Sequence, residues 1–309
     1  MTPSAVIALD RDNVVGPTPT WETLPEEERR LWLAEIENFP TPPFLLELMS
    51  KDLHIDYYNP ASLAAKLSRD SVLTGVLLAR ANSAALAPRQ PVTSLRMAIV
   101  HLGFNLVRSL IVHYQVERSA EQLKGIVKEH ILRIQKSTDR GAVIAFNWSS
   151  SLKLKDPAAV ATQCLLGRLG SFLMARRYPD RMDDYFSTGH EPQRLNFEAN
   201  NFGLTSRNLT YKIAQWWGLP EPMQLALFNL WTPLFAEFPD ASTCVASAAM
   251  SLSFDPPHHT DDIHKWLSKR VHFRLRQNLE AVGALKQLPN VLESDAYQRE
   301  MAAVEEIGN

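Results

Sequence analysis

The chain has 309 residues, of which 45% are hydrophobic and 21% charged, and its 32 basic and 34 acidic residues leave a net charge of −2. These values are typical of a soluble globular protein with a large core, and they disfavour a nucleic-acid-binding protein, which would carry a positive field. The two cysteines form no disulfide pattern, no signal-peptide layout is present, and no apolar run reaches the roughly 20 residues that span a bilayer. We therefore expect a reduced, cytoplasmic protein that is not inserted in a membrane.

Apolar residues recur at helical spacing along most of the chain, and almost nothing alternates with the period of two that marks a strand. Asn59 before Pro60 predicts a helix start, as does Ser94, whereas Gly103 predicts a helix end. In chain order, the predicted helices cover residues 25–37, 44–51, 60–69, 71–85, 95–102, 104–118, 121–150, 157–175, 179–186, 206–217, 220–231, 241–254, 260–272 and 279–307.

The predicted fold class is all-α. A short strand over residues 4–9 is the one exception that we expect, and a looser stretch without a helical pattern follows residue 186. The last predicted helix has a break at Pro289. No fixed-period repeat and no low-complexity segment interrupts this order of helices.

The predicted helix over residues 157–175 is apolar on nearly all sides, which indicates a position in the centre of the fold. Gly167 and Gly170 each lower helix propensity by about 1 kcal/mol relative to Ala, so we expect another helix to pack closely against them. Arg168 is the one charged residue in this run. It must find a partner or reach water, because burying an unpaired charge is very costly.

Several segments occur in an order that resembles a known family. They are FPTPP (39–43), LLEL (45–48), RDSVLT (69–74), LLARANSA (77–84), VTSLRMAI (92–99), LG (102–103), LVR (106–108), FG (202–203) and WGLP (217–220), with Glu198 before the last two. Together they resemble the HDOD domain, the HD-related output domain of bacterial signalling proteins. The resemblance implies an HD-like multi-helix bundle, related to metal-dependent HD phosphohydrolases but used for regulation. We expect an N-terminal extension with one helix over residues 1–38, the HDOD-like domain over 39–235 and a C-terminal helical segment packed on it over 236–309.

The resemblance also identifies the positions where catalytic HD relatives bind metal. Their His-Asp pair falls on Gly167 and Arg168, an earlier ligand His falls on Lys136, and Ser206 and Asn229 stand at or near two further ligand positions. A hydrolytic metal needs imidazole and carboxylate ligands, which Gly and Arg do not supply. We therefore predict no catalytic residue, no metal and no cofactor.

Two interpretations of the cations at these positions stay open. In the first, Arg168 and Lys136, helped by Arg140 one turn further on, bind a phosphate or carboxylate group of a ligand. In the second, Arg168 pairs internally with Glu198 or Asp183, and Lys136 is a solvated surface residue.

Other conspicuous residues are interpreted as structural or as ordinary surface. The first set is the family signature, which consists of Asn82, Ser83, Gly103 and Trp217. The second set is a metal-like cluster that we interpret as an exposed loop: His258, His259, Asp261, Asp262 and His264. The third set is a basic stretch that we interpret as a solvated helix face: Lys265, Lys269, Arg270, Arg274 and Arg276.

The sequence thus predicts a non-enzymatic regulatory protein of bacterial signal transduction. It is expected to bind a signalling protein partner, or a nucleotide or other phosphorylated small molecule. The alternatives are a residual phosphohydrolase or cyclic-dinucleotide phosphodiesterase, and an interaction scaffold without a ligand.

Overall fold

The computed structural model describes residues 20–39, 59–68, 71–83, 86, 88–120, 123–189, 191–219, 221–231, 240–254, 267–268 and 270–306. Within these residues all regular structure is helical and no strand occurs, which confirms the predicted all-α fold class. The predicted strand over 4–9, the predicted helix over 44–51 and the cluster from His258 to His264 lie outside the described residues, as do Lys265 and Lys269.

The helices follow one another along the chain with short connections. In order, they are η1 (Trp21–Thr23), α1 (Glu26–Glu37), α3 (Pro60–Leu67), α4 (Ser71–Ala81), α5 (Leu95–Leu102), α6 (Phe104–Ala120), α7 (Gly125–Ser151), α8 (Pro157–Leu166), α9 (Leu169–Arg177), η3 (Pro179–Arg181), α10 (Met182–Ser187), α11 (Glu191–Phe202), α12 (Ser206–Trp216), α13 (Glu221–Asn229), α14 (Ala241–Leu252), α16 (Phe273–Ala281), η6 (Leu285–Gln287), α17 (Leu288–Glu293) and α18 (Asp295–Glu306).

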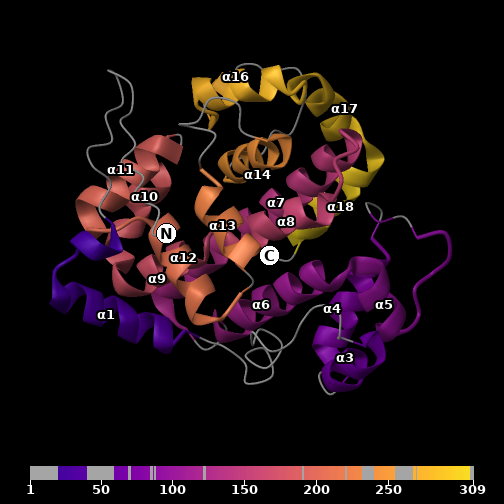
Figure 1. Cartoon of the computed structure of the whole chain (residues 1–309), viewed down its shortest axis with the longest axis horizontal. Helices are drawn as coiled ribbons and strands as arrows, with labels where there is room; N and C mark the ends of the chain where they lie inside the picture. The colour runs from indigo at the N-terminus through magenta and orange to yellow at the C-terminus, as the bar shows by residue number, and fades with distance from the viewer. Residues whose placement is uncertain are drawn as a thin grey trace.

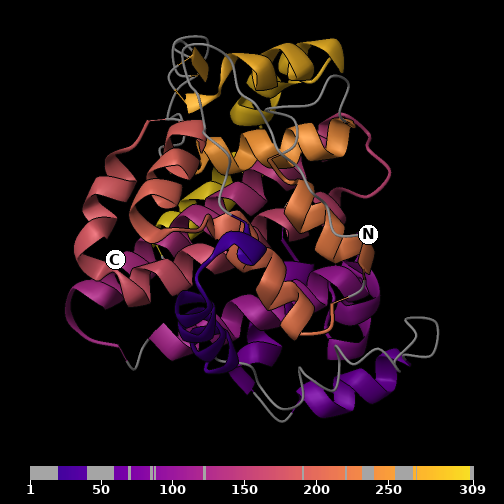
Figure 2. The same ribbon diagram turned by 60° about the vertical axis from the view of Figure 1, so that its left-hand side comes forward.

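Helices α7 and α8 lie side by side in the middle of the fold, and the other elements surround them (Figure 1). Helices α3 to α5 lie at one end of the molecule, whereas α16 and α17 lie at the opposite end, as both views show (Figure 2). Helices α6, α14 and α18 pack directly on the α7–α8 pair. This central pair therefore links the N-terminal and C-terminal parts of the described chain.

Local capping chemistry sets several of the helix ends. The side chain of Asn59 accepts a hydrogen bond from the N–H of Ala61 and Pro60 occupies the first helical position, while Ser94 caps α5 in the same way. Gly103 ends α5 with a φ of 76°, a left-handed conformation that a residue with a side chain rarely adopts. These ends agree with the prediction because each depends on two or three neighbouring residues.

The predicted single helix over residues 157–175 is two helices, α8 and α9, with a break at Gly167 and Arg168. Gly170 explains the close approach beyond the break, because a Cβ on this residue would clash with the backbone carbonyl oxygen of Ser206 in α12. Together α8 and α9 are long and apolar enough to cross a membrane by length and composition, but 83% of their most apolar window is buried inside the fold. Their hydropathy is accounted for by their place in the core.

Two helices occur where the sequence predicts none. Helix α11 occupies the stretch after residue 186 that has no helical pattern, and α16 fills the gap over residues 273–278 between two predicted helices before it continues into the first residues of the second. The break expected at Pro289 is present, because η6 ends at Gln287 and a new helix, α17, starts at Leu288 with Pro289 in its first turn; the chain turns again at Ser294 before α18. Proline is well tolerated at that position, where its missing N–H has no helical partner to lose.

Candidate functional site

The break between α8 and α9 places Arg168 in the interior, where its side chain is buried. Its Nη2 atom donates to the carbonyl oxygen of Met250 at 2.5 Å and to Oγ of Ser253 at 3.4 Å. The guanidinium carbon lies 4.0 Å from the centroid of the Phe254 ring. The internal hydrogen-bond partners of Arg168 are thus a backbone carbonyl and a hydroxyl, and not the carboxylates that the sequence suggests. Glu198 acts on Arg168 only through its charge.

Helices α10 to α12 surround Arg168 with further buried polar side chains. This buried polar cluster consists of Arg168, Tyr185, Glu191, Arg194, Glu198 and Ser206. In it, Arg194 Nη1 lies 2.5 Å from Oε2 of Glu191, and Oε2 of Glu198 accepts hydrogen bonds from both the backbone N–H and the hydroxyl of Ser206. Burial raises the pKa of Glu198 to about 7, against the opposing effect of the hydrogen bonds from Ser206.

The buried polar cluster is closed to solvent. Arg168, Glu191, Arg194 and Glu198 are all 2% exposed or less. Within the described part of the chain, the Nε atoms of Arg168 and Arg194 and the Oε1 atom of Glu198 are buried without a hydrogen-bond partner. Glu191 pairs with Arg194 in the interior, and no substrate can reach the cluster unless the helices separate.

The residues that the resemblance places at the metal position of catalytic HD relatives do not fit a metal ion. Gly167 has no ligand atom, and a Cβ there would lie 2.6 Å from Cδ2 of Leu230 and 2.7 Å from the carbonyl oxygen of Gln163, which leaves no room for an imidazole. Arg168 presents a cation, which repels a metal ion. Among the described residues, no group of three or more His, Cys, Asp or Glu side chains is placed to hold a metal. No metal chemistry can therefore be assigned to this position.

Lys136 and Arg140 lie together on α7, and both contact Glu305 of α18. Arg140 donates from Nε to Oε1 at 2.6 Å and from Nη2 to Oε2 at 2.8 Å, while Nζ of Lys136 lies 2.9 Å from Oε2. The hydrogen bonds from Arg140, followed by those from Lys136, lower the pKa of Glu305 to about 2. The predicted anion-binding cations thus hold a carboxylate of the same chain, and their partner differs from the partners of Arg168.

Among the family signature residues, Asn82 and Trp217 occupy structural positions. The side-chain amide of Asn82 donates to the carbonyl oxygens of Leu78 and Val92, and its Oδ1 accepts from the N–H of Val92. Trp217 is buried, with its ring centroid 5.6 Å from that of Phe39. Ser83, in contrast, lies on the wall of a pocket.

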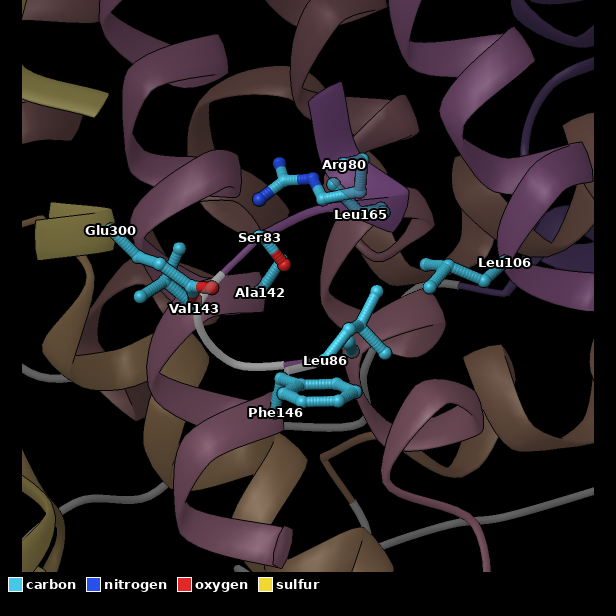
Figure 3. A pocket seen from close by; sticks show the side chains of 10 residues that line it. Arg80, Ser83, Leu86, Leu106, Ala142, Val143, Phe146, Leu165 and Glu300 are labelled. Atoms are coloured by element: carbon cyan, nitrogen blue, oxygen red, sulfur yellow. The ribbon is translucent and has the colours of Figure 1, made fainter. Parts of the chain in front are cut away.

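The pocket lies between the C-terminal end of α4 and the central helices, and the space between its wall atoms is about 360 Å³ when the open solvent at its mouth is included. Figure 3 shows the side chains that line it, with Arg80 on one wall and Leu86 and Phe146 on the opposite side. Sequence reasoning missed this site. The available signal is the spacing of Arg80 and Ser83, because residues three apart on a helix share a face.

The sequence matches the HDOD domain family over residues 39–233. The chain belongs to the HDOD family. No curated protein matches it. The expected division into segments 1–38, 39–235 and 236–309 stays a prediction, although the described HDOD helices and the C-terminal helices α14 and α18 pack together on α7.

Solved structures share the fold of this HDOD protein at low sequence identity. An HDOD domain protein of unknown function from Geobacter sulfurreducens is 19% identical, with a TM-score of 0.60 over 91% of this chain and 97% of the other. A candidate metal-dependent phosphohydrolase from Shewanella amazonensis is 13% identical, with a TM-score of 0.56 over 92% and 100%. A candidate signal transduction protein from Marinobacter aquaeolei is 13% identical, with a TM-score of 0.55 over 91% and 65%. These neighbours differ in the role that their names give them, so the choice of function depends on the residues of the site.

Proposed function

We propose that this protein is a cytoplasmic regulatory member of the HDOD family, which acts in bacterial signal transduction by binding and does not hydrolyse phosphate esters. Gly167 and Arg168 carry the proposal. They stand at the positions of the metal-binding His-Asp pair of catalytic HD relatives, and neither residue can bind the metal that such hydrolysis requires.

The packing around Arg168 supports this proposal. Its guanidinium makes a 2.5 Å hydrogen bond to Met250 and stacks on Phe254, so the side chain is built into the core and is not held ready for a substrate. Because the Arg168 side chain fills the space where catalytic relatives would bind a metal, we assign the fold a binding role and not hydrolysis. The partner in this proposal is a signalling protein or a small phosphorylated or nucleotide signal.

Measurements of metal content and of hydrolysis test the proposal that the protein is not a phosphohydrolase. The purified protein is incubated with manganese, iron and zinc salts, and metal content is measured by mass spectrometry after removal of free ions. Hydrolysis is then measured with a nitrophenyl phosphodiester and with cyclic dinucleotides. We expect less than one metal per chain and no turnover above the buffer. One bound metal per chain, with turnover that disappears in Arg168→Gln, would overturn the proposal.

Pull-down followed by mass spectrometry tests the binding part. A reproducible partner must then bind the purified protein in a two-component titration. Nucleotides are tested in parallel by thermal unfolding, because a ligand that binds the folded state raises the melting temperature more as its concentration rises. Absence of any binary partner together with a flat response to the nucleotides would contradict a binding role.

A further inference from the structure

The pocket behind the Asn82–Ser83 signature joins five segments of the chain. Its walls come from the end of α4 with Leu86, from α6, α7 and α8 in the centre, and from α18 near the C-terminus. The lining is mostly apolar: Leu86, Leu106, Ala142, Val143, Phe146, Ala161 and Leu165. Apolar walls with a few convergent polar groups are typical of sites for small molecules.

Two polar side chains on one wall are available to a ligand. Arg80 and Ser83 are both partly buried. Within the described residues, neither the guanidinium of Arg80 nor the hydroxyl of Ser83 makes a hydrogen bond or an ion pair. Arg80 is in the last turn of α4, Ser83 is two residues beyond its end, and both line the pocket (Figure 3). A guanidinium beside a hydroxyl presents several N–H donors and one O–H donor to the same oxygen-rich group.

Asn82 lies between Arg80 and Ser83 in the sequence, and its hydrogen bonds fix the turn that carries both donors. Its side chain bonds to the carbonyl of Leu78 and to both backbone groups of Val92. The turn that carries Arg80 and Ser83 is therefore fixed to the segment before α5. A fixed turn reduces the conformational entropy that is lost when a ligand orders its contacts.

Glu300 limits the charge that the pocket accepts. Its carboxylate belongs to α18, lines the pocket and accepts a hydrogen bond from Nδ2 of Asn147 at 3.2 Å. One cation and one anion thus border the same space. A ligand with a single negative charge pairs with Arg80, whereas a ligand with several phosphate charges meets repulsion from Glu300.

We infer that this pocket binds a small organic acid with one carboxylate and an apolar body. The carboxylate pairs with the guanidinium of Arg80 and the hydroxyl of Ser83, and the apolar body lies against Leu86, Leu106 and Phe146. The inference rests on the proposed binding role and names a ligand class for it.

Hexanoate, 1-hexanol and hexylammonium are the probes, because they share the apolar body and differ in the head group. Binding to the full-length protein is measured by ligand-observed NMR titration and by thermal unfolding. We expect hexanoate to bind with a Kd on the order of 1 mM. The alcohol and the amine should bind at least about tenfold more weakly, because they lack the charge that Arg80 recognises.

Arg80→Gln tests the site, and Arg96→Gln is its matched control. Arg96 is an exposed residue of α5 that does not line the pocket. Arg80→Gln should remove the preference for hexanoate over 1-hexanol, whereas Arg96→Gln should keep it. Arg80→Lys, which keeps the charge but loses the planar fork, should weaken hexanoate about threefold to tenfold, and it tests the site if Arg80→Gln fails to fold.

Three outcomes would overturn the inference: hexanoate binds the wild type and Arg80→Gln equally, 1-hexanol binds as tightly as hexanoate, or no probe binds in the millimolar range. None of them affects the proposed non-catalytic role, which is decided by metal content and hydrolysis. Conversely, metal-dependent turnover would overturn that role and leave a measured preference of the pocket for hexanoate in place.

Discussion

The side-chain amide of Asn82 pairs with both backbone polar groups of Val92, ten residues further along the chain, at 2.8 Å in each direction. A third hydrogen bond joins the same amide to the carbonyl of Leu78. These contacts imitate a short piece of backbone pairing and tie the end of α4 to the segment that precedes α5.

Asn82→Ala should therefore lower the free energy of unfolding by about 2 kcal/mol, since it leaves the N–H and C=O of Val92 without their partner. Urea denaturation followed by circular dichroism measures the loss. Asn38→Ala is the control, because the Asn38 amide makes one exposed hydrogen bond, to the carbonyl of Ala34, and its loss should cost less than about 1 kcal/mol. Equal losses in the two variants would contradict the role assigned to Asn82.

Gly170→Ala should be among the most damaging single-atom additions to the core. The added Cβ would meet the carbonyl oxygen of Ser206 and lie 2.8 Å from Cβ of Leu209, so α9 and α12 would have to separate. We expect a loss of about 2–4 kcal/mol, measured by chemical denaturation. The same change at Gly75, where no atom lies within 4 Å of the added Cβ, should stabilise by about 0.5–1 kcal/mol. A neutral Gly170→Ala variant would show that the two helices are not in close contact.

Arg168 should tolerate an apolar residue of similar size better than a small one. Arg168→Ala leaves a cavity under Phe254 and should cost about 3–5 kcal/mol. Arg168→Met fills most of that volume, and the carbonyl of Met250 keeps its hydrogen bond from Ser253 at 2.8 Å. Its cost should be less than half that of the Ala variant. Guanidinium chloride unfolding of the two variants makes the comparison. Equal costs would mean that the charge of Arg168, and not its volume, stabilises the core.

Glu305 should contribute stability that is lost in acid. Its pKa falls from 4.5 to about 2 in the folded state because Arg140 and Lys136 bind the carboxylate form. The contribution is complete above pH 4.5 and is lost as the pH falls toward 2. Since the Glu305 side chain is 35% exposed, we expect only about 1 kcal/mol from the ion pairs. Glu305→Gln should differ from wild type by this amount at neutral pH, and the difference should shrink toward pH 2. Glu293→Gln, at an exposed residue with no ion pair among the described residues, should show no such trend.

Glu198 should lower the free energy of unfolding as the pH rises, which is the opposite of the pH dependence expected from Glu305. Burial raises its pKa from 4.5 to about 7, so the folded state keeps a proton that the unfolded state has released. Stability therefore falls as the pH rises from 4.5 to 7, by about 3 kcal/mol if the whole shift is expressed. Glu198→Gln keeps an oxygen for the N–H of Ser206 and should flatten this slope. Denaturant midpoints measured across this pH range compare the two proteins, and parallel slopes would refute the assignment.

The two helices that the sequence pattern does not predict show where apolar periodicity fails. The inward face of α11 carries Glu191, Arg194 and Glu198, all buried, so the pattern of the segment resembles a polar surface. Helix α16 begins in a basic stretch whose composition is typical of a solvated face, and yet Leu275 and Leu279 are buried. A buried ion pair has no signature in a hydrophobic pattern, because the pattern registers only apolar side chains.

By itself, the sequence determined the all-α class, the HDOD family and the helix ends at Asn59 and Ser94, since each depends on local spacing or on short motifs. Tertiary structure alone decided the partners of the charged residues. Glu305 is 165 residues from Arg140, and Arg168 bonds to the carbonyl of Met250, 82 residues away. Every residue carries such a carbonyl, so no sequence pattern distinguishes this one. The pocket beside Arg80 likewise exists only because five separate segments of the chain converge there.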